Sequence, residues 1–262
     1  MSKAVLSLAA ITLLLCGLRA IRSEAENRLT ADERIGETSQ HGFVIVELFT
    51  SQGCSSCPAA DENLVRIQEL AAEKNLPVYV LSMHVDYWNR LGWKDPFSQS
   101  VFSQRQRGYA QAFGSTRIYT PQMVINGQTE FVGSDVAKSN EAIKNSLNST
   151  QKEPLEISAK WNKSRDAITF RYNATANSKG KTLVLAIVQK RAENPVDSGE
   201  NRGRTLAHVN VVLKLETIKN IQITGQETIR VSYNTNNEPL GLIAFVQDPF
   251  SQQIMAAKRT DL

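Results

Sequence analysis

The sequence predicts a mixed α/β domain at residues 42–150, followed by an all-β, sandwich-like domain at residues 151–262. In the first region, short runs of β-forming residues alternate with segments whose apolar residues recur every three or four positions, the spacing of amphipathic helices. From residue 151 onward, only short β-forming runs occur, separated by Asn, Asp, Ser and Gly at spacings typical of an antiparallel sandwich. Hydrophobic residues make up 41% of the chain, which is enough to form buried cores.

The beginning of the chain has the composition of a secretory signal, which we place at residues 1–25. Lys3 precedes an apolar stretch, and Ala20 and Ala25 each provide a small residue before a cleavage position. The stretch is short for a membrane span, so we expect no stable membrane insertion after cleavage, with an uncleaved anchor as the alternative. Residues 26–41 are polar and are expected to form a flexible leader. These features predict a periplasmic or secreted protein.

Removal of the signal simplifies the cysteine content and the charge. Cys16 leaves with it, so that Cys54 and Cys57 are the only cysteines of the mature chain. In an oxidising compartment, such a pair fits a catalytic dithiol or a Cys54–Cys57 disulfide. The formal net charge of +4 falls close to balance, and no basic run with interleaved aromatic residues occurs. We therefore expect no nucleic-acid partner.

The stretch from Val44 to Pro58 predicts a thiol pair at the start of a helix. A run of β-formers ends in a short polar turn, two cysteines follow, and Pro58 begins a segment with helical spacing. The first turn of a helix has unpaired N–H groups and partial positive charge, which stabilise a thiolate and lower its pKa. We expect Cys54 to be the more exposed cysteine, which attacks a disulfide, and Cys57 to expel the bound partner.

A Cys-x-x-Cys motif also occurs in zinc sites and in structural disulfides. A zinc site needs two further ligands, and the chain has no second Cys-x-x-Cys or His-x-His pair. A bridge that closes so small a loop removes little chain entropy, so it stabilises a fold weakly. The redox-active interpretation is therefore favoured, with metal binding and a structural disulfide as alternatives.

A second predicted strand, Pro77 to Met83, is followed by His84 and Asp86. Because ligands meet the carboxyl ends of strands in open α/β sheets, both residues are candidates for the same site as the thiol pair. Residues 87–114 are rich in Trp, Tyr, Phe and Gln and include a helical segment from about Pro96 to Phe113. This segment either caps an active site or packs its aromatic residues in the core.

The end of the α/β region predicts a hairpin and a helix. Pro121 precedes a hydrophobic strand that ends at Asn-Gly, and residues 129–132 complete the hairpin. Ser134 or Asp135 then caps a helix that ends near Leu147.

The stretch Val46–Pro58 resembles the active-site strand and turn of the thioredoxin superfamily. Together with His84–Ser98, Tyr119–Met123 and Gly199–Gly203, it resembles more closely a family of secreted bacterial thioredoxin-like proteins, domain of unknown function 1223. The resemblance covers nearly the whole mature chain and implies a thioredoxin-like fold for the α/β domain. It is specific for the fold and not for a substrate.

The resemblance implies roles for three residues. In thioredoxin-like proteins, a proline at the position of Pro121 is cis and faces the thiol pair, which exposes the backbone of Thr120 to an extended substrate chain. Glu47 stands near the position of a buried acid that manages the proton of the second cysteine. Because a buried charge is costly unless it is paired, a structural ion pair is the alternative role of Glu47.

His84 has three alternative roles. As an imidazolium it tunes the thiolates; as a metal ligand it joins Cys54 and Cys57 in the manner of copper-handling thioredoxin-like proteins; otherwise it is a hydrogen-bonded structural histidine. Asp86 either orients His84 or caps the following turn. The loop from Gly199 to Arg204 is either a solvated turn or faces the thiol cleft.

The sequence thus predicts a thiol–disulfide oxidoreductase that acts on protein thiols or disulfides without a cofactor. Cys54 forms the mixed disulfide, Cys57 resolves it, Pro121 shapes the substrate groove and Glu47 relays a proton. One alternative is a Cu(I)-binding or copper-delivery protein that uses Cys54, Cys57 and His84. Another is a non-catalytic binding module with a structural disulfide.

Overall fold

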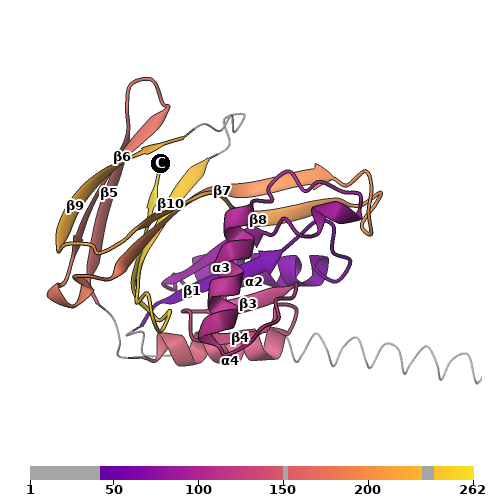
Figure 1. Ribbon diagram of the computed structural model, residues 1–262, viewed down its shortest axis with the longest axis horizontal. Helices are drawn as coiled ribbons and strands as arrows, with labels where there is room; N and C mark the ends of the chain where they lie inside the picture. Colours follow the sequence, from indigo (N-terminus) through magenta and orange to yellow (C-terminus); the bar gives the residue numbers. More distant parts are fainter. Residues whose placement is uncertain (1–41, 150–152, 232–238) are drawn as a thin grey trace, which may run out of the picture. The chain divides into compact units, whose positions relative to one another are not determined.

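The computed structural model describes residues 42–149, 153–231 and 239–262. The expected signal at residues 1–25 and leader at residues 26–41 lie outside this part of the chain. Among the residues described, no helix combines the length and apolarity that a membrane crossing requires. The described chain has a mixed α/β arrangement with three α-helices, one large sheet and one small sheet (Figure 1).

The region up to residue 149 alternates strands with helices, in agreement with the sequence pattern. Its elements are β1 (Val44–Thr50), α2 (Pro58–Glu73), β2 (Val78–His84), the 3-10 helix η1 (Asn89–Leu91), α3 (Ser100–Ala112), β3 (Gln122–Ile125), β4 (Thr129–Val132) and α4 (Val136–Leu147). Of the two candidate caps for the last helix, Asp135 is the N-cap, and its carboxylate accepts a hydrogen bond from the Lys138 N–H at 3.0 Å.

The described residues from 153 onward form strands and one short 3-10 helix. The elements are β5 (Leu155–Trp161), β6 (Ala167–Ala174), η2 (Ala176–Ser178), β7 (Thr182–Pro195), β8 (Thr205–Ile218), β9 (Thr224–Arg230), β10 (Leu240–Gln247) and β11 (Ile254–Asp261).

The large sheet contains strands from both predicted domains. Its eight strands follow the order β11-β10-β7-β8-β2-β1-β3-β4. β1 pairs in parallel with β2 and antiparallel with β3, and β2 joins β8 in a parallel pair at Ser82 and Val211. The expected boundary between residues 150 and 151 therefore does not separate two independent sheets. Hydrophobic periodicity identifies strands but not their neighbours, which accounts for this difference.

β7 shows how the later strands contribute to two cores. Its alternate side chains point to opposite faces of the sheet. One set, which includes Leu185, packs with Phe170 of β6 in a core shared with the three-stranded sheet β5-β6-β9. The other set, which includes Ala186, packs with Phe49 of β1 and Phe102 of α3. A sandwich is thus present, but one of its two sheets is the extension of the large sheet.

α2 and α3 cover opposite faces of the large sheet. α3 packs on the face of β1 that contains Phe49. Leu48, the preceding residue of β1, points to the other face, where it lies with Ala60 of α2 beside Gly133. α2 begins with Cys57 as its N-cap, directly followed by a proline, which is favoured in the first turn of a helix. The cysteines consequently lie at the carboxyl end of β1.

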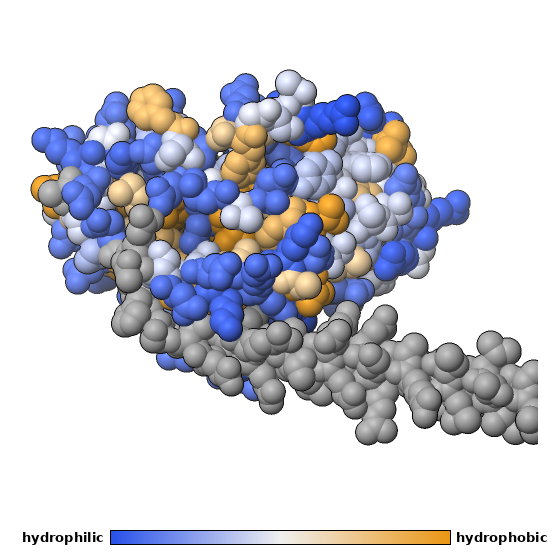
Figure 2. Space-filling view, turned by 90° about the horizontal axis from the view of Figure 1, so that it is seen from below, coloured by the Kyte–Doolittle hydropathy of each residue, from blue (hydrophilic) through white to orange (hydrophobic). Residues whose placement is uncertain are grey.

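The face shown in Figure 2 is mostly hydrophilic, with hydrophobic residues in separate small groups. Among the large hydrophobic side chains of the described residues, Phe250 in the turn between β10 and β11 is the most exposed, at 90%. Single exposed apolar side chains are normal on protein surfaces. The site is therefore better sought at the cysteine pair than at an apolar surface.

Candidate functional site

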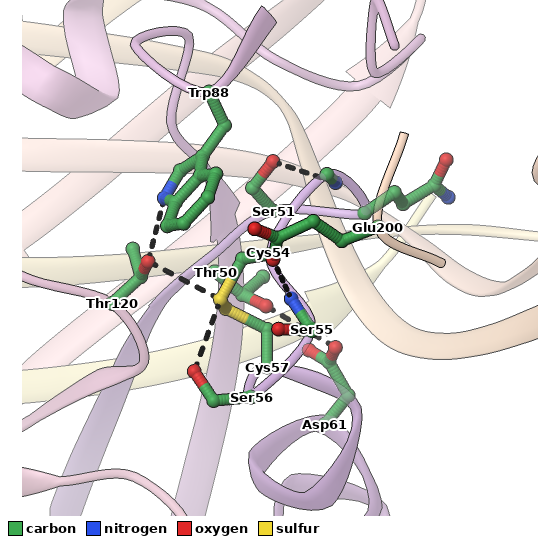
Figure 3. Close-up of a disulfide and its surroundings, with 12 residues drawn as sticks. Thr50, Ser51, Cys54, Ser55, Ser56, Cys57, Asp61, Trp88, Thr120 and Glu200 are labelled. Atoms are coloured by element: carbon green, nitrogen blue, oxygen red, sulfur yellow. Dashed lines mark hydrogen bonds between the residues drawn. A yellow bond between two sulfur atoms is a disulfide. The ribbon is translucent and has the colours of Figure 1, made fainter. Parts of the chain in front are cut away.

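Cys54 and Cys57 form a disulfide at the start of α2, with their Cα atoms 5.4 Å apart. The turn that follows β1 places Cys54, whose N–H donates to the Ser51 carbonyl at 3.2 Å. The carbonyl of Cys57 accepts hydrogen bonds from the N–H groups of Ala60 and Asp61, at 2.9 and 3.0 Å, which are the first bonds of the helix. The expected pairing and the expected position at a helix start are both present (Figure 3).

The Thr120–Pro121 segment lies beside the disulfide. The peptide bond between these residues is cis, as the resemblance implied. The Thr120 hydroxyl donates to the sulfur of Cys54 at 3.4 Å and accepts a hydrogen bond from the Trp88 indole N–H at 2.7 Å (Figure 3). The Ser56 hydroxyl lies 3.4 Å from the same sulfur. Two hydroxyl groups are thus positioned to interact with negative charge on Cys54.

Both cysteines are fully buried, so the expectation that Cys54 is the more exposed of the two is wrong. The tip of the hairpin between β7 and β8 covers the turn that carries them. Its Glu200 carboxylate accepts a hydrogen bond from the Ser55 N–H at 2.9 Å. The Asn201 side-chain amide donates to the carbonyls of Gln52 and Cys54, at 2.9 and 2.8 Å. These contacts join residues almost 150 positions apart, which no local pattern reveals.

The hairpin tip is also attached to the loop that follows β2. The Ser198 hydroxyl donates to the Gly92 carbonyl at 2.5 Å. Gly199 has a φ of +78°, and a Cβ at this position would lie 3.1 Å from the Cβ of Trp93. The hydrogen bonds from Ser55 lower the pKa of the Glu200 carboxyl below its usual value. Of the two alternatives for the Gly199–Arg204 loop, the one that faces the thiol pair is therefore observed.

Glu47 does not face the disulfide but belongs to a buried ion pair with α3. Its carboxylate lies 2.5 Å from Arg105 Nε and 3.0 Å from Arg105 Nη2, and it also accepts a hydrogen bond from the Tyr109 hydroxyl. Burial alone would lower the pKa of Arg105, but attraction to the Glu47 carboxylate exceeds this effect and raises it. This geometry favours the structural ion pair over the proton relay for Glu47.

His84 is a buried histidine whose two ring nitrogens are both engaged. Nδ1 lies 2.7 Å from the Asp95 carboxylate and Nε2 lies 3.2 Å from the Ser82 hydroxyl. Burial by itself lowers the pKa of His84, but the Asp95 carboxylate more than offsets this, and the pKa is raised. Burial likewise acts to raise the pKa of Asp95, and interaction with His84 brings it below the usual value. His84 and Asp95 therefore form a buried histidine–carboxylate pair in which each partner favours the charged form of the other.

The partner of His84 differs from the expected one. Asp86 accepts a hydrogen bond from the Ser103 hydroxyl of α3 at 2.5 Å, so it ties the loop after β2 to α3 and does not orient His84. Because the nitrogens of His84 point to Asp95 and Ser82, His84 does not join Cys54 and Cys57 in a ligand set. Within the described part of the chain, no group of three His, Cys, Asp or Glu side chains has the geometry of a metal site.

Several residues of the site were not singled out from the sequence. Asp61, one helical turn beyond Cys57, accepts a hydrogen bond from the Thr50 hydroxyl at 3.2 Å and lies 3.6 Å from Nδ1 of His208 in β8. The His208 and His84 rings meet edge to face, with centroids 4.6 Å apart. The spacing of Asp61 from Cys57 was visible in the sequence, but the approach of His208 depends on the pairing of β8 with β2.

A sequence family described as "Protein of unknown function (DUF1223)" matches residues 45–247. The chain belongs to the DUF1223 family. The matching region contains the disulfide, the cis proline and the hairpin tip, so all parts of the site lie within the DUF1223 unit. No curated protein matches the chain.

Solved structures that are similar to this chain include the following two. Protein AGR_C_4864 from Agrobacterium tumefaciens is 26% identical, with a TM-score of 0.63 over 84% of this chain and 95% of that protein. HBP35 of Porphyromonas gingivalis is 18% identical, with a TM-score of 0.57 over 86% of this chain and 77% of that one, a likeness that concerns the fold alone.

Proposed function

We propose that the Cys54–Cys57 pair is the redox centre of a thioredoxin-like thiol–disulfide oxidoreductase that acts on protein thiols or disulfides outside the cytoplasm. The observation that carries the proposal is the contact between the Thr120 hydroxyl, at the cis Thr120–Pro121 bond, and the sulfur of Cys54 at the start of α2. The position of β1 between β2 and β3 supports the thioredoxin-like fold. A signal-like N-terminus and a disulfide support the location.

The exchange proceeds through a mixed disulfide. A substrate thiolate attacks the sulfur of Cys54, the Cys54–Cys57 bond breaks, and its electron pair leaves on Cys57, which then takes up a proton. A second substrate thiolate attacks the mixed disulfide and releases Cys54 as a thiolate, so that the substrate dithiol is oxidised and the protein is reduced. The steps run in reverse when the substrate has the higher reduction potential.

The surroundings of the sulfurs favour these steps. The Thr120 and Ser56 hydroxyls lie 3.4 Å from the sulfur of Cys54 and can donate to its thiolate. Cys57 is the N-cap of α2, where the unpaired N–H groups and the helix dipole stabilise a leaving thiolate. Both features lower the free energy of the sulfur that carries negative charge.

The closed hairpin tip requires one further step. Because both sulfurs are buried, a substrate reaches Cys54 only after the surrounding chain opens, and in this proposal the opening step is the release of Glu200 and Asn201 from the turn that they bind. The freed Ser55 N–H and the carbonyls of Gln52 and Cys54 then become hydrogen-bonding groups for a substrate chain. The hairpin tip thus occupies the place that a substrate takes.

The full burial of both sulfurs also favours a second candidate, a non-catalytic binding module with a structural disulfide. The two candidates differ in the reduction potential of the disulfide. A structural disulfide of a secreted protein has a potential below about −300 mV, whereas a redox centre exchanges at higher potentials.

The test is an equilibrium titration of the mature protein in thiol–disulfide buffers, combined with a disulfide-transfer assay on a reduced protein substrate. We expect a measurable potential above about −300 mV and catalytic turnover. Cys54→Ser should abolish turnover, Cys57→Ser should accumulate a mixed disulfide, and Ser55→Ala, an exposed neighbour, should retain turnover. A disulfide that resists reduction and gives no turnover would refute the oxidoreductase and support the binding module.

A further inference from the structure

A cavity of about 320 Å³ lies along the first turns of α2, on the side that faces the start of β8. Its walls come from α2 between Pro58 and Val65 and from the chain between Arg204 and Ala207. Glu62, Arg204 and Ala207 are exposed, whereas Asp61 is only 4% exposed. The cavity therefore leads from solvent to Asp61 without passing the turn that Glu200 and Asn201 cover.

Asp61 is well placed with respect to Cys57. The Asp61 N–H donates to the Cys57 carbonyl at 3.0 Å, so the two residues are four positions apart on one face of a helix. Side chains at this spacing are neighbours, with their Cβ atoms about 5–6 Å apart. The Thr50 hydroxyl donates to one carboxylate oxygen of Asp61 (Figure 3), and the other oxygen is buried without a hydrogen-bond partner.

The unpaired oxygen of Asp61 faces Nδ1 of His208, and the surrounding bonds determine where the His208 proton lies. The Trp93 indole is only a donor, and it donates to the Gln52 side-chain oxygen at 3.1 Å. The Gln52 amide nitrogen consequently faces His208 Nε2, at 3.1 Å, and donates to it. A neutral His208 therefore carries its proton on Nδ1, which lies 3.6 Å from Asp61 Oδ1.

The other titratable groups near this pair have partners of their own. His84, whose ring lies against His208, is paired with Asp95, and Glu47 is paired with Arg105. Glu62 and Arg204 lie at the solvent end of the cavity and are exposed. Asp61 is thus the buried carboxylate next to Cys57 that has both an unpaired oxygen and a route to solvent.

We propose that Asp61 exchanges the proton of Cys57 when the disulfide opens or closes, that His208 orients Asp61, and that the cavity connects Asp61 to solvent. This inference rests on the proposed function. On opening, Cys57 leaves with the electron pair of the broken bond and receives a proton from Asp61, which is reprotonated through the cavity. On closing, Asp61 accepts the proton of the Cys57 thiol, and the resulting thiolate attacks the mixed disulfide at Cys54.

The consequence is that proton and substrate use separate routes. The substrate reaches Cys54 on the side that the hairpin tip covers, and the proton reaches Cys57 from the cavity. Because His208 belongs to β8, the strand that begins at the end of the hairpin tip, the same element orients Asp61 and positions the cover.

The test measures the rate at which oxidised glutathione, a small disulfide, re-forms the Cys54–Cys57 bond of the reduced protein between pH 5 and 9. This reaction is called closing below. Asp61→Asn should slow closing about 100-fold near pH 7, which is the scale of general acid–base catalysis. The difference in rate between wild type and variant should become smaller as rising pH ionises Cys57 directly. Glu69→Gln removes an exposed carboxylate of the same helix that does not line the cavity and should stay within about twofold of the wild-type rate. An unchanged pH profile in Asp61→Asn refutes the inference.

A second variant removes the dependence on how well Asp61→Asn folds. Ala207→Leu fills the exposed end of the cavity without altering Asp61 and should slow closing about tenfold near pH 7, a fraction of the general acid–base effect. If Asp61→Asn loses its circular dichroism signal, an unchanged rate in Ala207→Leu refutes the inference. A wild-type disulfide that no dithiol reduces refutes the proposed function itself, which distinguishes that failure from the failure of Asp61.

Discussion

The side chain of Asn201 should control how readily the disulfide reacts. It lies in the hairpin tip, is 1% exposed, and donates to the carbonyls of Gln52 and Cys54. When the tip opens, both carbonyls can bind water, so these two hydrogen bonds stabilise the closed state in particular. Asn201→Ala removes both of them and should increase the population of the open state.

The expected magnitude follows from the two bonds. Each buried hydrogen bond between neutral groups contributes about 0.5–1.5 kcal/mol, so the closed state should lose about 1–3 kcal/mol. A free-energy change of this size corresponds to about a 5- to 150-fold change in an equilibrium constant. If reduction proceeds through the open state, the rate should rise by the same factor.

The assay is the initial rate of reduction of the Cys54–Cys57 disulfide by dithiothreitol, measured by alkylation of the released thiols. Arg202→Ala is the matched control, because Arg202 is an exposed residue of the same tip and its substitution leaves the Asn201 bonds in place. A rate for Asn201→Ala within twofold of the control would contradict the view that the tip limits access.

Three further substitutions test the packing around the site. Arg105→Ala leaves the Glu47 carboxylate buried without its cationic partner and should lower the free energy of unfolding in urea by about 3–5 kcal/mol. The raised pKa of His84 stabilises the fold below about pH 6.5, and this stabilisation is lost as pH rises through the folded-state pKa. The lowered pKa of Asp95 stabilises the fold above about pH 3.8, and this is lost as pH falls. Asp95→Asn should therefore lower Tm most near pH 5, and the Tm of the variant should fall less steeply than that of the wild type as pH rises above 6.5. An equal loss of Tm at all pH values would contradict the ion pair. Gly127→Ala places a Cβ 1.9 Å from a carbonyl oxygen of the turn between β10 and β11, and should lower Tm by several degrees more than Gly114→Ala, which has similar φ but open space. Equal losses of Tm in the two variants would show that the strained backbone, and not the close approach to the carbonyl oxygen, causes the destabilisation.

Local features of the α/β region followed from the sequence. The helix that begins at Pro58, the hairpin after Pro121 and the cap at Asp135 all depend on contacts within a few residues, and all are present. The position of the cysteine pair belongs to the same group, because a strand, a turn and a helix start in sequence bring the pair to the carboxyl end of β1. The cis bond at Pro121 followed from the family resemblance.

Features that depend on distant parts of the chain did not follow. Cys54 was expected to be more exposed than Cys57, but both are buried, and Asn201, which binds the Cys54 carbonyl, is 147 positions away. The partner of His84 proved to be Asp95, since folding of the loop after β2, and not sequence proximity, brings a carboxylate to its ring. The large sheet, which combines strands from both predicted domains, depends likewise on the pairing of β8 with β2.

The sequence by itself determined the position of the cysteine pair at a helix start, and the resemblance to the DUF1223 family added the cis proline. Only the tertiary structure decided that the pair is enclosed and that Glu47 is bound by Arg105, leaving Asp61 next to Cys57. The physical reason is that backbone preferences act over a few residues, whereas burial and charge pairing depend on which distant segments the sheet brings together.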